Sequence, residues 1–217
     1  MSSEFLTSES EIRDFLSKFN ISNFTVNSDG SVDVQGSIYL DNLKAKQLPI
    51  QFGKVDGDFV CNGGELVTLK GSPRYVNGNY YVHHNRLKDF QYSPEEVTGN
   101  VSYDNNEEVT SIEGIVPKIG GDLFMENLPK LENLHNIHKH VTALGYGLFG
   151  SGHIKTDGTP LKSNVLGLLL IKGLDEVTLA NKELSKLINK YLKSEEKDLH
   201  MCQEELIESG FGMEAKL

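Results

Sequence analysis

The stretch "VNGNYYVHHNRLKDF" holds the densest set of side chains that could do chemistry. It contains Tyr80, Tyr81, His83, His84 and Arg86. Imidazoles exchange protons near neutral pH, phenols donate hydrogen bonds and a guanidinium binds anions, so the set suits acid–base work or ligand recognition. The same residues also fit one turn of a repeating scaffold whose polar side chains point outward. The pattern along the rest of the chain decides between these interpretations.

A second cluster of titratable side chains lies in "LHNIHKHV". Three imidazoles, those of His135, His138 and His140, are close enough in sequence to suggest a zinc site. No Cys, Asp or Glu completes a known ligand spacing, and Ile137 and Val141 indicate ordinary packing between the histidines. We therefore expect no metal site and no cofactor.

The glycine-rich stretch "GYGLFGSGH" invites comparison with phosphate-binding loops. It lacks the G-K-[ST] sequence, and no βαβ unit precedes it, so a flexible loop over Gly145–Pro160 is expected instead. There is no G-x-S-x-G elbow and no preferred catalytic set, so we expect no enzyme. The alternative is an enzyme whose site lies in this loop and the C-terminal region, with His153 or Cys202 reacting. Cys202 falls on an apolar helical stripe, which favours packing.

The composition narrows the classes of partner. The 217 residues carry a formal net charge of −10, which disfavours nucleic-acid binding, although a local basic strip of Lys44, Lys46 and Lys54 stays open. The longest apolar run, Val165–Ile171, is too short to cross a membrane, and the N-terminus does not resemble a signal peptide. Two distant cysteines predict reduced thiols and a cytoplasmic protein.

The strongest signal is an internal repeat. Similar anchors begin at six positions, at steps of 21, 21, 21, 22 and 22 residues: "VQGSI" at Val34, "VDGDF" at Val55, "VNGNY" at Val76, "VTGNV" at Val97, "IGGDL" at Ile119 and "VTALG" at Val141. A unit of this length cannot bury its apolar residues alone, so stacked units must share one core. The spacing predicts a solenoid of five to six coils.

Each unit continues in the same way after its anchor. Alternating apolar residues predict a short strand with one buried face: Phe59 and Cys61, Tyr80 and Val82, Val101 and Tyr103, Leu123 and Met125. Asn85 and Asn106 follow at a fixed offset, with Asn127 one place early, and an asparagine amide suits the bend after a strand. The anchor glycine is expected to permit a tight or positive-φ entry. The strands would form a parallel sheet.

The unit Tyr80-x-Val82-x-x-Asn85-x-Leu87-x-x-Phe90 resembles the leucine-rich-repeat segment. With its V-x-G-[DN]-aromatic lead and the G-x-P-like ending in "LKGSPRYVNGNY", it is similar to the leucine-rich-repeat-like proteins of large tailed bacteriophages. The resemblance covers about Val34 to Leu217 and implies an α/β solenoid in the cytoplasm of the infected cell. It implies little about activity. Gly64 and Leu43 depart from the repeat at the asparagine column.

Both ends of such a stack need caps. Residues 1–33 predict a helix followed by a hairpin: Ser8 and Glu11 form a capping box, and the chain turns at Ser28-Asp29-Gly30. The coils occupy residues 34–144. Residues 145–217 predict the flexible loop, a buried strand at "VLGLLLI" and two amphipathic helices, the first around Leu184–Leu192 and the second ending at Gly210.

Strand alternation also predicts which side chains point outward. They form a central row (Tyr39, Val60, Tyr81, Ser102, Phe124), an acidic row (Asp41, Asn62, His83, Asp104, Glu126) and an entry row (Ser37, Asp58, Asn79, Asn100, Asp122). Aromatic side chains in a polar frame are typical of protein-binding surfaces, so we expect a protein partner. The resemblance to the phage proteins implies that this partner is a host protein, such as a defence or regulatory protein. The candidate contacts are Tyr39, Asp41, Val60, Tyr81, His83, Asp104, Phe124 and Glu126. The alternatives are a solvated acidic face without a partner and a structural homo-oligomer.

Overall fold

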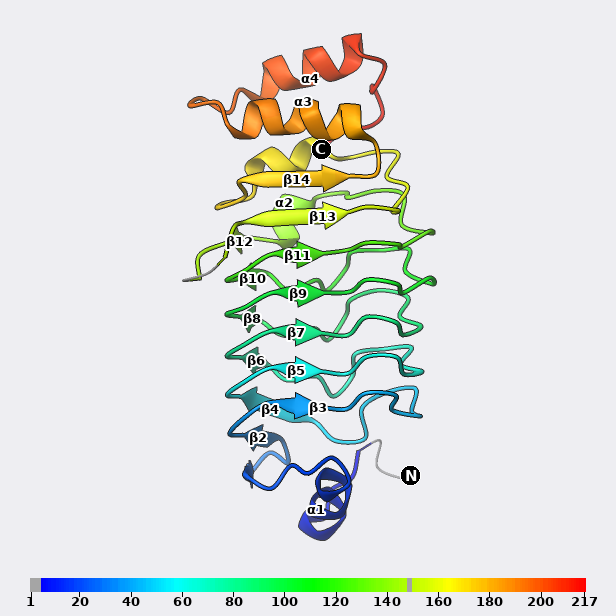
Figure 1. The fold of residues 1–217 in the computed structure, drawn as a ribbon, viewed down its shortest axis with the longest axis vertical. Helices are drawn as coiled ribbons and strands as arrows, with labels where there is room; N and C mark the ends of the chain where they lie inside the picture. Colours follow the sequence, from blue (N-terminus) through cyan, green and yellow to red (C-terminus); the bar gives the residue numbers. More distant parts are fainter. Residues whose placement is uncertain (1–4, 148–149) are drawn as a thin grey trace.

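The computed structural model describes residues 5–147 and 150–217, which form a solenoid of parallel strands with few helices (Figure 1). Two sheets of seven strands each run along the stack, so the chain makes about seven turns rather than five to six. The stack is longer than the repeat predicts because the coils continue past residue 144. In Figure 1 the helix α1 lies at one end of the stack, and α3 and α4 lie at the other.

The coils from β2 to β13 each contribute one short strand to each sheet, while β1 adds a strand to sheet A and β14 adds one to sheet B. Sheet A contains, in spatial order, β1 (Phe24–Val26), β2 (Val32–Val34), β4 (Phe52–Val55), β6 (Tyr75–Val76), β8 (Glu96–Val97), β10 (Lys118–Ile119) and β12 (Ala143–Leu144). Sheet B contains β3 (Ile38–Tyr39), β5 (Phe59–Val60), β7 (Tyr80–Tyr81), β9 (Val101–Ser102), β11 (Leu123–Phe124), β13 (His153–Thr156) and β14 (Glu176–Leu179). All neighbours pair in parallel except β1 and β2.

The predicted inward columns are confirmed. Phe59 is in register with Tyr80, Tyr80 with Val101, and Val101 with Leu123, and all four side chains are fully buried. The later apolar positions of each unit are buried as well: Leu66, Leu87, Val109, Leu131, Leu69, Phe90, Ile112 and Leu134. Aromatic rings contact from coil to coil inside the stack, with the Phe59 and Tyr80 centroids 5.5 Å apart. Burial between coils therefore holds the repeat together.

The bend after each strand of sheet B uses two separate positions. The first has a left-handed backbone in six coils, where only Asn, Gly and His occur: Asn42, Gly63, His84, Asn105, Asn127 and Gly158. The second holds the buried Asn85 and Asn106. Asn127 belongs to the first position, so its alignment with Asn85 and Asn106 in the sequence was wrong.

The buried asparagines bond to the coil before them as well as to their own. Asn85 Oδ1 accepts from the Leu66 N–H at 3.2 Å, and its Nδ2 donates to the carbonyls of Cys61 and Val82. Asn106 repeats this pattern one coil later. Gly64 leaves room for the Asn85 amide, because a Cβ there would lie 2.8 Å from Asn85 Oδ1. The departure at Gly64 is thus part of the same bend.

The anchor glycines are needed for packing rather than for a positive φ. A Cβ on Gly57 would lie 2.6 Å from the backbone of Gly36, and one on Gly78 would lie 2.6 Å from Gly57. Gly36 has a positive φ, of 124°, whereas Gly57, Gly78, Gly99 and Gly121 do not. Of the two alternatives in the prediction, the tight entry is confirmed for Gly57, Gly78 and Gly99, where stacked corners leave no space for a side chain, and the positive-φ entry holds for Gly36.

The N-terminal cap agrees with its sequence signals. Helix α1 (Glu9–Ser17) begins with the capping box of Ser8 and Glu11, and Ile12, Phe15 and Leu16 are its buried residues. Strands β1 and β2 form the predicted antiparallel hairpin. The cap therefore covers the apolar interior of the first coil, where Ile38 and Leu40 are fully buried.

The C-terminal cap contains the two predicted helices, α3 (Lys182–Leu192) and α4 (Leu199–Glu208), and the short helix α2 (Ile137–His140) precedes them. The segment "VLGLLLI" is not a strand: Leu166–Leu170 form a 3₁₀ helix, because the continuous apolar run that suggested a strand suits either structure. Within the predicted loop Gly145–Pro160, residues 153–156 form β13, so a fully flexible loop is wrong there. Leu148 and Phe149 of that loop lie outside the described residues.

Candidate binding face

The outer face of sheet B brings the predicted rows together. Register places Tyr39, Val60, Tyr81, Ser102 and Phe124 side by side across five consecutive strands. Tyr39 is 54% exposed, Tyr81 and Phe124 are half-buried, and Val60 and Ser102 are buried. Val60 therefore offers little of its own surface for contact and lies between the two tyrosines. The central row is a strip with three accessible aromatic side chains.

The entry row differs from the free polar frame that the sequence suggests. Each of its side chains accepts a hydrogen bond from the backbone N–H of the same position one coil later. Ser37 Oγ accepts from Asp58, Asp58 Oδ1 from Asn79 at 2.7 Å, Asn79 Oδ1 from Asn100, and Asn100 Oδ1 from Asp122. These bonds satisfy backbone donors that lie just outside the short strands. The entry row is mainly structural.

In the acidic row, some side chains also accept a hydrogen bond from the backbone N–H of the same position one coil later. Asp41 Oδ1 accepts from the Asn62 N–H, Asn62 Oδ1 from His83, and Asp104 Oδ1 from Glu126 at 2.7 Å. Asp104 Oδ2 also accepts from the Ser102 hydroxyl at 2.9 Å. Burial raises the pKa of Asp104, because its effect is larger than the lowering effect of these two hydrogen bonds. Both oxygens of the Asp104 carboxylate thus accept hydrogen bonds within the chain, whereas the Glu126 side chain beside it is half-exposed.

The histidine pair that opens the question of chemistry lies at the edge of this face. His83 follows β7 and is half-buried, and His84 is exposed with a φ of 56°, one of the left-handed bend positions. Their Nδ1 atoms are 2.8 Å apart. Burial lowers the pKa of His83, and the neighbouring His84 lowers it further. The pair therefore favours a state in which at least one imidazole is neutral, and the scaffold explains both positions.

The face extends further than the repeat predicts. Lys155 is in register with Phe124, and its amino group lies 5.1 Å from the Phe124 ring centroid. Thr178 follows Lys155 on β14, and His153 Nε2 lies 2.8 Å from the Thr178 hydroxyl. Neither strand lies within or directly after an anchor, so the spacing alone could not find them; only the alternation in "HIKT" and "EVTL" signals them.

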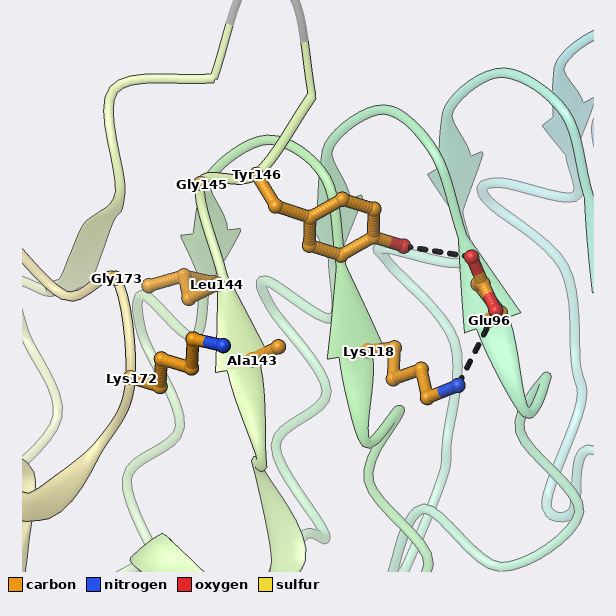
Figure 2. A pocket seen from close by; sticks show the side chains of 8 residues that line it. All are labelled: Glu96, Lys118, Ala143, Leu144, Gly145, Tyr146, Lys172 and Gly173. Atoms are coloured by element: carbon orange, nitrogen blue, oxygen red, sulfur yellow. Dashed lines mark hydrogen bonds and ion pairs between the residues drawn. The ribbon is translucent and has the colours of Figure 1, made fainter.

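A separate open pocket of about 370 Å³ lies on the sheet A side, between β8, β10 and the segment after β12 (Figure 2). Tyr146 reaches over it and donates to Glu96 Oε1 at 3.0 Å, and Lys118 Nζ lies 3.6 Å from Glu96 Oε2. Ala143 and Leu144 line its floor, and Lys172 lies at its side. The polar groups of this pocket largely neutralise one another, which gives it little to fix a ligand's orientation.

The other sequence candidates are not assembled into a site. Among the described residues, no three side chains of His, Cys, Asp or Glu lie close enough together to hold a metal ion. His135 bonds to the neighbouring Asn136, and His138 lies near Gly167. Cys202 is fully buried, and burial raises its pKa to about 12, which leaves its thiol protonated at neutral pH. Cys61 is likewise a buried free thiol.

The local basic strip is largely paired. Lys44 lies 3.6 Å from Glu65 and Lys54 lies 3.1 Å from Asp56, so two of its three charges face carboxylates. Along the described part of the chain, the helices are all too short or too polar for a membrane span.

Comparison of the chain with protein-family models, with curated proteins and with solved structures gives no match. The outer face of sheet B is therefore the feature of the molecule that bears on its function.

Proposed function

We propose that this chain is a non-enzymatic protein-binding module that docks a basic or amphipathic protein surface on the outer face of sheet B. The observation that carries the proposal is the central row, in which three accessible aromatic side chains lie in register across five strands. Aromatic residues on a rigid backbone supply contact area at a small entropic cost, which suits them to be binding anchors.

The surrounding polar rows support the same proposal. The ladder from the Ser37 hydroxyl through Asp58 and Asn79 fixes the backbone of consecutive coils, so the aromatic strip needs little ordering when a partner docks. Asp41 and Glu126 add negative charge at the side of the strip. A partner with lysine or arginine beside an apolar centre complements this arrangement, and the charges would raise the rate of association.

The resemblance to the leucine-rich-repeat-like proteins of tailed bacteriophages supports a finer proposal. The coil with Tyr80, Val82, Asn85 and Leu87 matches that segment, and Asn85 bonds as a bend residue should. On this basis the module is phage-encoded and acts on a host protein in the cytoplasm of the infected cell. This step depends on analogy of repeats, because fold alone does not determine function.

The test replaces Tyr81 and Phe124 with Asp and measures capture of host proteins by mass spectrometry. A matched control carries Tyr75→Asp and Tyr92→Asp, two exposed tyrosines that lie outside the central row. Loss of two aromatic anchors is expected to weaken binding of a specific partner by about thirtyfold or more, equivalent to about 2 kcal/mol. Capture that is unchanged in the Tyr81/Phe124 variant, or lost equally in the control, would exclude this face.

A further inference from the structure

The first strand of sheet B leaves its outer edge unpaired. In later coils, the carbonyl at the central-row position always accepts from the coil before it: Val60 from the Leu40 N–H at 2.7 Å, Tyr81 from Cys61, and Ser102 from Val82. Strand β3 is the terminal strand of the sheet, so the equivalent carbonyl of Tyr39 has no such donor among the described residues. The carbonyls of Ser37 and Asp41 likewise have no backbone donor among the described residues.

Backbone donors at this edge are also open. The N–H groups of Asp58 and Asn62 donate to the side chains of Ser37 and Asp41, one coil earlier. The N–H groups of Ser37 and Asp41 themselves meet no such acceptor among the described residues. In a parallel pair, alternate residues bond to opposite neighbours. Since Ile38 and Leu40 donate to the coil of β5, the N–H of Tyr39 points to the open edge.

The packing around β3 shows that there is space at this edge. A Cβ on Gly57 would meet the coil before it at 2.6 Å, whereas a Cβ on Gly36 would meet nothing within 4 Å. The apolar interior below β3 is nevertheless closed, because Ile38 and Leu40 are fully buried and α1 covers that end. What is missing at this edge is therefore a set of hydrogen-bond partners, and no apolar surface remains to be covered.

We propose that the edge of β3 docks an extended peptide segment of a partner protein, which adds to sheet B as one further parallel strand. The repeat defines the chemistry of this segment. To satisfy the N–H groups of Ser37 and Asp41, it carries acceptor side chains at two positions four residues apart, as Asp58 and Asn62 do within the chain. Strand addition of this kind obtains affinity from main-chain bonds and specificity from alternate side chains.

Charge sharpens the choice of side chains. The chain carries a net charge of −10, and Asp41 lies beside the edge. Ser or Asn therefore suits the two acceptor positions better than Asp, and Lys or Arg is favoured in the flanking residues.

A second copy of the chain does not fit this edge. At the other end of sheet B, side chains of α3 occupy the edge of β14: Asn189 bonds to both backbone groups of Val177, and Ser185 bonds to those of Leu179. Copies therefore cannot stack head to tail. Two β3 edges would meet about a two-fold axis as antiparallel strands between two acidic molecules, without the parallel acceptor pattern.

The site goes beyond the proposed function, since it uses the backbone edge of β3 rather than the outer face of sheet B. The first experiment selects random nine-residue peptides displayed in a library against the full chain, followed by fluorescence polarisation of the enriched peptides. Enrichment of Ser or Asn four residues apart is expected. Tyr39→Pro removes the edge donor without removing a bond to β5, and it should weaken binding at least about tenfold, the equivalent of one hydrogen bond or slightly more.

Tyr81→Asp distinguishes this site from the outer face. It should leave peptide affinity within about twofold, because surface changes away from a contact have small effects. Peptide binding that is lost with Tyr81→Asp and kept with Tyr39→Pro would overturn the edge proposal while supporting the face.

Amide hydrogen exchange on the wild-type chain provides a second measurement that does not depend on the folding of a variant. The amide of Tyr39 should exchange freely without peptide and should slow at least about tenfold when peptide binds, since exchange reports the opening of each hydrogen bond. No enrichment of the acceptor spacing, or no change at Tyr39, would contradict the proposal. Protection that rises with protein concentration alone would identify a second copy as the occupant and also contradict it.

Discussion

The two ends of sheet B differ in how the backbone hydrogen-bonding groups of the terminal strand are satisfied. At β14, Asn189 donates to the Val177 carbonyl and accepts from its N–H, both at 2.8 Å, and Ser185 does the same for Leu179. At β3, the corresponding groups of Tyr39 face outward without such partners among the described residues. An unpaired strand edge can pair with a further strand. Because the β14 edge is closed and the β3 edge is open, sheet B can be extended by a bound strand only at β3.

The closed end shows what closing an edge requires. Residues four apart on a helix are separated by about 6 Å, and residues two apart on a strand by about 6.6 Å. Ser185 and Asn189 therefore match Leu179 and Val177 along the edge of β14, with α3 antiparallel to the strand. The apolar residues Leu184 and Ile188 of the same helix are buried against the stack. Among the described residues, no side chain of α1 at the other end hydrogen-bonds to β3.

Removing the polar pair of α3 should have the largest effect. Ser185→Ala with Asn189→Ala leaves the buried backbone groups of Val177 and Leu179 unpaired, which should lower the free energy of unfolding by about 3 kcal/mol. The variant should also begin to self-associate through β14, which sedimentation velocity detects. Lys186→Ala, on the exposed side of the same helix, is the control in urea unfolding. Equal stability of the two variants would show that the pair does not close the edge.

The glycine corners give a smaller, purely steric test at the open end. Gly57→Ala places a methyl group 2.6 Å from the backbone of Gly36, so the first two coils must separate slightly, at a cost of about 1–3 kcal/mol. Gly212→Ala is matched, because a Cβ there meets nothing within 4 Å and its φ is not positive. Its unfolding midpoint in urea should be close to that of the wild type. A stable Gly57→Ala variant would mean that the corners are not in close contact.

The smallest effect concerns pH at the closed end. Burial lowers the pKa of His153, whose Nε2 contacts Thr178 on β14. The unfolded chain therefore takes up a proton near the ordinary pKa of 6.5, before the folded chain does, and the stability contributed by this group is present above pH 6.5 and is lost as the pH falls below it. Thermal unfolding between pH 7.5 and 5.5 should show a shallower pH dependence for His153→Gln than for the wild type. An identical pH dependence would contradict the assigned shift.

The sequence predicts most of the middle of the molecule, because there the same residue types recur at the same structural positions in every coil. The anchors at Val55, Val76 and Val97 fix the register of the coils, and alternation then places Tyr80 inside and Tyr81 outside. The capping box of Ser8 and Glu11 fixes the start of α1 in the same local way. Strand alternation and capping rules therefore suffice where a residue packs against the equivalent residues of adjacent coils.

The rest depends on contacts that the local pattern does not encode. Asn127 matches both the left-handed bend and the buried column, since asparagine satisfies either, and only the structure shows which. One coil later, Thr159 holds the buried position and bonds as Asn85 and Asn106 do: its hydroxyl accepts from the Leu128 N–H and donates to the Met125 carbonyl. The edge-closing role of Asn189 is equally hidden, because a polar residue on a helix normally faces water.

The hydrogen bonds between coils have one consequence for how such a chain can change length. Asp58 and Asn79 each accept from the equivalent N–H one turn later, and Asn85 bonds to the turn before it, so turns in the middle of the stack are joined to their neighbours by similar hydrogen bonds. Excising residues 76–96, or duplicating them, would bring together turns whose facing surfaces are similar to those already in contact. The length of the solenoid can therefore change in whole turns while the N-terminal and C-terminal caps stay the same.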